Sequence, residues 1–359
     1  MPIDRSHLTP RPGRNLLTFA VAAWLGASLL YIGAGCVNRQ PTEAAKSAAA
    51  LDSYVQGVMA YQQGDTAKAM SELKDAVSKK NDLVMARSML GDLYRSKSDY
   101  DNALEQYSVL SKLDAYSCQN HYRLGLVYQL LDRLQEAAVS YLKAVDLKPD
   151  DAPSNMSLGT VYLGLAQRGI GTTPEADLAE LRERAVKYAQ RAVELDPNNA
   201  AAQVNLGVTL DEVKEYARAE AAYRKCLELD ANQPTVQLYL GENLLMQKKA
   251  KEARSVFSEL VKVEDTPRNR KRLGDAYAAE GNFADALTQY QAALKMDANY
   301  YPALNQIGTT YIAQYEKGLG LDETKRKAAL EAWQQSLSIY RTQPQITALI
   351  QKHSKPRAY

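Results

Sequence analysis

The sequence contains few of the residues that usually carry out chemistry. Three histidines and three cysteines occur in 359 residues, and they lie far apart along the chain. They are His7, His121, His353, Cys36, Cys118 and Cys226. None of them has the spacing of a zinc site, and no CxxC motif is present. The sequence therefore predicts no metal, no redox centre and no cofactor.

The chain also has little excess charge of either sign. Lys and Arg number 44 against 42 Asp and Glu, so the formal net charge is +2. The excess lies in residues 1–35, where three arginines stand against a single acid, Asp4. A strongly basic surface is the electrostatic mark of nucleic-acid binding, and the remaining chain is neutral overall. We therefore expect no nucleic-acid partner.

One long apolar run occurs, and it lies near the start. Residues 1–14 are polar and basic, and residues 16–34 contain no charged side chain over 19 positions. A basic start followed by an apolar run predicts an export signal. The run also approaches the roughly 20 residues that span a bilayer, so an uncleaved membrane helix stays open. We assign residues 1–35 to an export signal or membrane anchor and residues 36–50 to a linker.

The apolar run ends in the sequence IGAGC, residues 32–36. Small residues before a cysteine resemble the lipobox of bacterial lipoproteins, although Gly33 stands where that motif usually has an aliphatic residue. The resemblance implies that Cys36 carries a lipid. With a lipid or with an uncleaved helix, the arginines would keep the N-terminus in the cytoplasm. The rest of the chain would then be membrane-anchored in the cell envelope, on the periplasmic or extracytoplasmic side.

A glycine recurs along most of the chain at steps close to 34 residues. Twelve residues after most of these glycines comes an alanine, and four residues later an aromatic residue or a leucine, as in Gly125, Ala137 and Tyr141. A fixed period of this length is typical of a stacked array of helix pairs. The repeat glycines are Gly57, Gly91, Gly125, Gly159, Gly207, Gly241, Gly274 and Gly308.

Each unit reads as two antiparallel helices. Glycine and alanine let two backbones approach closely, and spacings of three and four residues place them with the aromatics on one helix face. Proline disfavours helix in the residue before it, so LKPD at 147–150 and LDPN at 195–198 end the second helix. One helix pair cannot bury its apolar face alone, so the units must stack. Because Cys118 and Cys226 lie about three units apart, we expect separate thiols and no disulfide.

This pattern resembles the tetratricopeptide repeat family. The resemblance covers about residues 50–342, in eight copies. It implies an all-α fold, a right-handed superhelical solenoid of about eight antiparallel helix pairs, over residues 51–344. Residues 345–359 would form a capping helix and a basic tail. Single positions depart from the pattern, as at Leu210, with residues that are mostly apolar or small.

Two units are longer than the others, with insertions near 166–180 and 315–325. There we expect Ala185 and Ala329 to be the equivalents of the repeat alanine. The segment Thr172-Thr-Pro-Glu predicts the start of a long second helix in the fourth unit. Both insertions would project from the same edge of the array. They represent either tolerated loop growth or a contact with a partner.

The resemblance also implies where a ligand would bind. In the family the first helices build a concave wall, and its variable positions lie three before the glycine, one after it and four after it. In the middle units these positions form an apolar and aromatic wall that becomes polar toward the C-terminus. Such a groove suits an amphipathic helix or an extended peptide. The alternative is that these side chains pack on adjacent helices and line no groove. The predicted peptide-binding residues are Tyr122, Leu126, Gln129, Met156, Thr160, Val204, Val208, Asp211, Leu238, Glu242 and Lys271.

The predicted function is a non-catalytic scaffold that binds other proteins and assembles a complex for pilus, secretion, envelope or cell-wall assembly. The segment after the repeats is too short for a catalytic domain. We interpret acids such as Asp211 and Glu212 as solvated helix faces and not as a catalytic pair. The alternatives are a regulatory subunit of an envelope enzyme, and a protein that binds glycans or other cell-wall ligands. Tyrosines outside the repeat pattern would serve a glycan site: Tyr54, Tyr61, Tyr116, Tyr300 and Tyr301.

Overall fold

The computed structural model describes residues 42–355, and within that range it contains seventeen α-helices and no strand. The first helices of the eight units are α1 (Glu43–Gln62), α3 (Val84–Ser96), α5 (Cys118–Leu130), α7 (Ala152–Gly169), α9 (Ala200–Glu212), α11 (Pro234–Met246), α13 (Pro267–Ala279) and α15 (Tyr301–Lys317). The second helices are α2 (Thr66–Lys79), α4 (Tyr100–Leu113), α6 (Leu134–Leu147), α8 (Glu175–Leu195), α10 (Tyr216–Leu229), α12 (Ala250–Val263), α14 (Phe283–Met296) and α16 (Glu323–Ile339). A last helix, α17, spans Pro344–His353.

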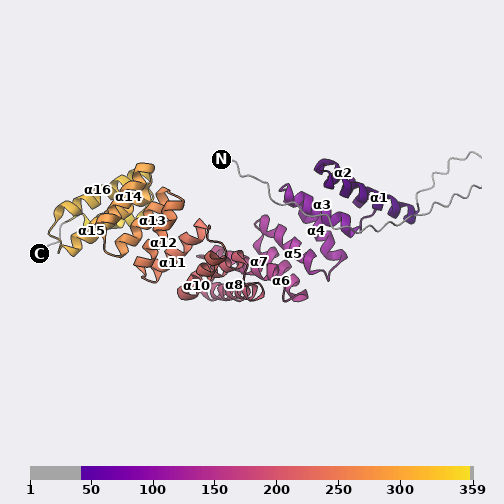
Figure 1. Ribbon diagram of the computed structural model, residues 1–359, viewed down its shortest axis with the longest axis horizontal. Helices are drawn as coiled ribbons and strands as arrows, with labels where there is room; N and C mark the ends of the chain where they lie inside the picture. Colours follow the sequence, from indigo (N-terminus) through magenta and orange to yellow (C-terminus); the bar gives the residue numbers. More distant parts are fainter. Residues whose placement is uncertain (1–41, 356–359) are drawn as a thin grey trace, which may run out of the picture.

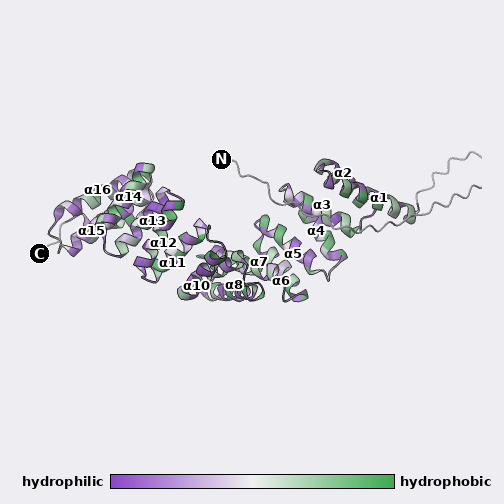
Figure 2. Cartoon of the chain, viewed as in Figure 1, coloured by the Kyte–Doolittle hydropathy of each residue, from purple (hydrophilic) through white to green (hydrophobic). Residues whose placement is uncertain are grey.

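The helices follow one another along a curved arc, with α1 and α2 at one end and α15 and α16 at the other (Figure 1). Each helix contacts chiefly the helices that precede and follow it in sequence. Apolar and polar residues are interleaved along the helices throughout the arc (Figure 2). None of the helices in residues 42–355 is both long enough and apolar enough to cross a membrane. The predicted all-α solenoid of stacked helix pairs is confirmed.

The repeat glycines pack against the second helix of their own unit, as the spacing predicts. A Cβ atom at Gly241 would lie 2.3 Å from Cε1 of Phe257, and one at Gly207 would lie 2.4 Å from Cε1 of Tyr223. Real Cβ atoms do not approach a ring so closely, so only glycine lets the aromatic side chain lie flat beneath the first helix. The close packing of the two helices therefore requires the glycine and the aromatic residue together.

The fourth unit shows why it lacks the aromatic residue. There a Cβ at Gly159 would lie 3.0 Å from the backbone nitrogen of Ala189, so α7 and α8 are too close for a ring between them. The expected alanines of the two longer units, Ala185 and Ala329, are both fully buried. The alignment of the units across both insertions is therefore correct.

The insertions lengthen helices more than loops. The first and second helices of the fourth unit have 18 and 21 residues, whereas most other units have 13 and 14. The second helix is long, as predicted, but its start is different. It begins at Glu175, with Pro174 at the N-cap position, and Thr173 donates its backbone N–H to the carbonyl of Gly169 in the preceding turn. The threonines close the turn after α7, so they do not cap α8.

The array begins earlier than predicted, and its C-terminal end has the predicted helix. α1 begins at Glu43, inside the range predicted as a linker, because its alanine-rich start favours helix and the Thr42 side chain accepts the N–H of Ala45. At the other end, α17 occupies the segment predicted as a capping helix and packs on α16. The predicted signal or anchor over residues 1–35, and Cys36, lie outside the described residues.

Candidate interaction surface on the concave face

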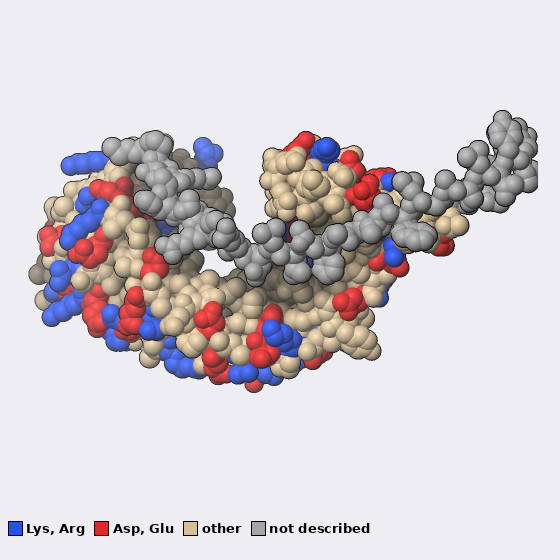
Figure 3. Space-filling model, turned by 45° about the vertical axis from the view of Figure 1, so that its right-hand side comes forward, with Lys and Arg blue, Asp and Glu red and all other residues tan. Residues whose placement is uncertain are grey.

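The described chain curves around a hollow, and the outer surface seen in this view carries many charged residues of both signs (Figure 3). Two cavities span successive first helices. One, of about 670 Å³, is lined by α1, α3 and α5, and the other, of about 370 Å³, by the starts of α11 and α13. Both of these cavities are lined chiefly by residues of first helices.

Several of the predicted groove residues of the third and fourth units already have partners in the chain. The rings of Tyr122 and Tyr141 are 5.7 Å apart, and Gln129 accepts the hydroxyl hydrogen of Tyr141 at 2.9 Å. Leu126 is half-buried against the same cluster. In the fourth unit the exposed Thr160 donates its hydroxyl to the carbonyl of Met156 at 3.1 Å.

The predicted apolar residues of the fifth and sixth units are mostly core residues. Val204 and Val208 pack half-buried against the central hydrophobic cluster, and Leu238, 6% exposed, belongs to it. Leu238 also lines the smaller cavity, next to Tyr239. For the two valines the structure therefore favours packing on adjacent helices.

The predicted polar residues form contacts within the wall. Asp211 accepts the hydroxyl of Tyr223 at 2.8 Å and the side-chain N–H of Asn243 at 2.5 Å. Burial raises the pKa of Asp211, although these two hydrogen bonds oppose the shift. The interpretation of Asp211 as a solvated side chain is therefore wrong, while Glu212 lies 3.7 Å from Arg182 in an ion pair.

The remaining two predicted polar residues are held in ion pairs. Glu242 lies 2.5 Å from Arg272 of the next unit. Lys271 lies 2.7 Å from Asp275. These pairs fix the side chains along the wall, and they leave less charge for a ligand than the sequence pattern predicts.

A recurring contact accounts for four of the 23 tyrosines of the chain. Buried tyrosines of second helices pass beneath the repeat glycine, and their hydroxyls donate to polar side chains on the first helix. Tyr107 donates to Asp92 at 2.7 Å, and Tyr290 donates to Asp275 at 3.1 Å. Burial, together with the neighbouring carboxylate, raises the pKa of each of these tyrosines. Phenylalanine would fill the same space, but it has no hydroxyl to hold the polar side chain of the first helix in place.

The larger cavity contains none of the residues predicted for the groove. Its wall includes Tyr61 and Met85, each 52% exposed, and the charged residues Asp92, Arg95 and Arg123. Asp92 lies 3.7 Å from Arg95 and 3.4 Å from Arg123. The full lining is Tyr54, Tyr61, Val84, Met85, Ser88, Met89, Asp92, Leu93, Arg95, Ser96, Asp114, Ser117, Gln119, Asn120 and Arg123.

The signal for this cavity was present in the sequence. Tyr54 and Tyr61 lie three before and four after Gly57, and Asp92 follows Gly91 directly, which are the positions used for the middle units. Applying the same rule to the first two units would have found them. Of the other tyrosines considered for a glycan site, Tyr116 is 88% exposed at a turn, and Tyr301 stacks on Tyr340 at 5.1 Å.

The two cysteines of the described residues are poor nucleophiles. Cys118 and Cys226 are separate free thiols, and burial raises the pKa of both, which disfavours the reactive thiolate. Within residues 42–355 no three His, Cys, Asp or Glu side chains are grouped so that they could hold a metal ion. What the surface offers is shape, aromatic and thioether contacts, and paired charges.

The solved structures that resemble this chain have low sequence identity to it. A tetratricopeptide repeat protein from Parabacteroides merdae is 16% identical, covers 86% of this chain and all of its own, and has a TM-score of 0.46. The APC/C hetero-tetramer Cut9-Hcn1 is 11% identical over 81% of this chain and 53% of the matched chain, with a TM-score of 0.49. PilF of Pseudomonas aeruginosa is 18% identical over 66% and 97%, with a TM-score of 0.47.

Curated relatives are much longer than this chain. Superkiller complex protein 3 of Mus musculus is 26% identical over 279 residues, which are 73% of this chain and 17% of the relative. Tetratricopeptide repeat protein 37 of Xenopus laevis is 24% identical over 135 residues, or 38% and 9%. The chain thus spans less than a fifth of the curated relatives that it matches.

Family models described as tetratricopeptide repeat match residues 119–151, 179–234, 214–269 and 271–337. These matches together cover more than half of the chain. They agree with the period near 34 residues and with the contacts between glycine and an aromatic ring in most units. The chain belongs to the tetratricopeptide repeat family.

Proposed function

We propose that this protein is a non-catalytic scaffold that binds peptide or helical segments of other proteins along its inner wall and so assembles a multiprotein complex. Tetratricopeptide repeat proteins typically mediate interactions between proteins, and a curved array offers an extended concave surface for that purpose. The observation that carries the proposal is the open cavity of about 670 Å³ across α1, α3 and α5. Its aromatic, methionine and arginine residues are types that dominate protein interfaces.

The wall around the cavity is well suited to hold a segment in one position. Asp92 accepts the hydroxyl of Tyr107 and lies near two arginines, so these charged groups are ordered before a ligand arrives. Preorganised groups lose less conformational entropy on binding. Tyr61 and Met85 supply apolar contact area beside them and are open to solvent. A helix or strand with an apolar side chain toward this wall would bury both.

Replacing Tyr61 by Ala together with Met85 by Glu is expected to lower partner recovery at least about tenfold, because loss of two anchors is worth more than about 1.4 kcal/mol. Partners are identified by cross-linking in cells followed by mass spectrometry. Tyr122→Ala with Leu126→Glu tests the central wall in the same way. Val263→Glu on α12, at a side chain 58% exposed, is the matched control, since Val263 lines neither of the two cavities described above. Unchanged recovery with both inner-wall variants, with helicity retained by circular dichroism, would contradict the proposal.

We further propose that the scaffold is tethered to a membrane outside the cytoplasm. The support is the charge-free run over residues 16–34 and the cysteine that follows it at position 36. The tether would place the inner wall within the cell envelope, where it would serve the assembly of a pilus, secretion or cell-wall complex.

The change Cys36→Ser is expected to abolish labelling of the protein by a fatty-acid probe, because the thiol is the only group at that position able to carry the lipid thioether. In-gel detection of the probe in cells measures this. The parent chain serves as the positive control, and Cys118→Ser, at a half-buried thiol, should label normally. Labelling that persists in Cys36→Ser would remove the lipid anchor and leave the uncleaved helix.

A further inference from the structure

The two ends of the described array are finished differently. At the C-terminal end, α17 covers α16, and Arg326 donates to the carbonyl of His353 at 2.8 Å. At the N-terminal end no described element precedes α1. The end units of repeat arrays require a polar outer face for solubility. α1 instead has four large apolar side chains exposed, more than any other described helix: Leu51, Val55, Met59 and Tyr61.

Comparison between units shows what normally covers this face. The residues two after and five before each repeat glycine meet the preceding unit, and in units two to eight none of these fourteen side chains is more than 5% exposed. The equivalent residues of the first unit are Met59, 47% exposed, and Asp52, also exposed. The fourteen buried residues of units two to eight are Leu93, Val127, Val161, Thr209, Asn243, Ala276, Thr310, Ala86, Asn120, Ser154, Ala202, Val236, Asn269 and Ala303.

Val55 belongs to the same uncovered face. It lies two before its glycine, and in later units that position reaches back to the preceding first helix. Arg123 contacts Ser88 and Asp92 in this way, and Arg272 contacts Glu242. In the first unit Val55 is 44% exposed. The face of α1 is therefore the surface on which a preceding unit would stack, at the point where the described residues begin.

We infer that this face binds a second copy of the chain, with the two α1 helices packed antiparallel about a two-fold axis at Val55. Leu51, Val55 and Met59 are spaced by four residues, so they form one stripe along the helix. In an antiparallel pair centred on Val55, Leu51 of each copy lies opposite Met59 of the other. A two-fold contact needs such a self-complementary stripe, because the same patch serves both copies.

The charges of α1 agree with this pairing. Asp52 is the only charged residue of the helix within eight positions of Val55, and in this register it lies opposite Val58. No like charges therefore meet across the axis. Leu51, Val55 and Met59 do not line the cavity across α1, α3 and α5, so the pairing leaves that cavity open for a peptide. The inference does not rest on peptide binding by that groove.

The test is cross-linking of the full chain, purified in detergent, at single cysteines. Val55→Cys is expected to form a disulfide-linked dimer under mild oxidation, because the two thiols meet on the axis. Leu51→Cys and Met59→Cys should cross-link strongly when the two variants are mixed and weakly when either is alone. The parent chain measures any background from its native cysteines, and Val139→Cys on α6 is an exposed control away from the face.

A second measurement does not depend on cysteine chemistry. Val55→Glu is expected to raise the dimer dissociation constant at least about tenfold in sedimentation velocity, since it places two carboxylates together in an apolar contact. Val55→Cys linkage no greater than that of Val139→Cys, or a monomeric parent chain at tens of micromolar, would overturn the inference. Loss of another protein with Val55→Glu, while the parent chain is monomeric, would show that a different partner covers the face. In either event the groove variants at Tyr61 and Met85 report separately on peptide binding.

Discussion

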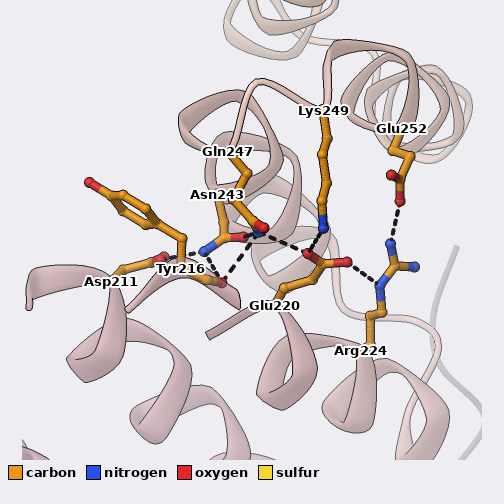
Figure 4. A network of polar contacts seen from close by, with 8 residues as sticks. All are labelled: Asp211, Tyr216, Glu220, Arg224, Asn243, Gln247, Lys249 and Glu252. Carbon is orange, nitrogen blue, oxygen red and sulfur yellow. Dashed lines mark hydrogen bonds and ion pairs between the residues drawn. The ribbon is translucent and has the colours of Figure 1, made fainter. Parts of the chain in front are cut away.

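Glu220→Gln is expected to lower the free energy of unfolding by about 2–3 kcal/mol at neutral pH and by roughly half as much near pH 3. Glu220 lies on α10, and its side chain is 12% exposed. Its carboxylate accepts from Lys249 at 2.7 Å, from Gln247 at 2.8 Å and from Arg224 at 2.9 Å (Figure 4). Arg224 also reaches Glu252 at 2.9 Å, so this one carboxylate joins α10 to the start of α12. Removing its charge leaves two cations facing a neutral amide.

The pH dependence follows from the pKa of Glu220. Burial alone would raise that pKa, but the hydrogen bonds from Lys249, Gln247 and Arg224 outweigh it and lower the pKa to about 2. A carboxyl group in an unfolded chain titrates near 4.3, so the stabilisation is complete above about pH 5 and is lost as the pH falls toward 2. Burial raises the pKa of Asp211, so protonation of that group acts in the opposite direction.

Urea unfolding at pH 7 and pH 3, with hydrogen exchange of peptides from α10 to α12, measures both the size and the place of the effect. Glu228→Gln is the matched control. Glu228 pairs with Lys225 at 3.1 Å on the same helix, but its side chain is 66% exposed, and such pairs contribute little. An equal loss in both variants at pH 7, or a Glu220→Gln loss that is the same at pH 3, would show that the network does not stabilise the contact between the fifth and sixth units.

The spacing of residues predicted the fold well because each helix pair repeats one local packing problem. The glycine at 241 and the ring at 257 lie 16 residues apart, and that separation, repeated along the chain, already places them face to face in two antiparallel helices. The pattern located the equivalent alanines even where insertions changed the spacing. It missed the first turn of α8 because Thr172 and Thr173 have the composition of a helix cap and also of a turn.

The candidate site was less predictable, because exposure depends on what lies beneath a residue as well as on its position in the repeat. Tyr54 and Tyr122 hold the same position in their units, but Tyr122 packs on the ring of Tyr141, whereas the first unit has Leu73 at the position of that ring. The acids that accept tyrosine hydroxyls also lie at two different positions. Asp92 follows its glycine by one residue and Asp211 by four. No single spacing rule describes both.

Trp333→Ala is expected to cost about 3–5 kcal/mol, the usual loss when a large buried aromatic side chain is removed. Trp333 lies on α16, is 1% exposed, and packs with Ile312 and Ile346 in the last hydrophobic cluster. Its indole N–H donates to the carbonyl of Asn305 at 3.1 Å, and its ring lies 6.1 Å from that of His353. One side chain thus joins α15, α16 and α17.

Removal of the Trp333 side chain is expected to unfold the last unit and α17 before the other units, because each unit is stabilised only by its neighbours. Hydrogen exchange should therefore accelerate in peptides from residues 301–353 and remain unchanged in α3 and α4. Trp333→Phe is the control, since it keeps a ring against Gly308 and loses the hydrogen bond, and it should cost less than half as much. If exchange rises uniformly along all eight units, the array unfolds as one cooperative body, and the stability of the last unit is not set by the packing around Trp333.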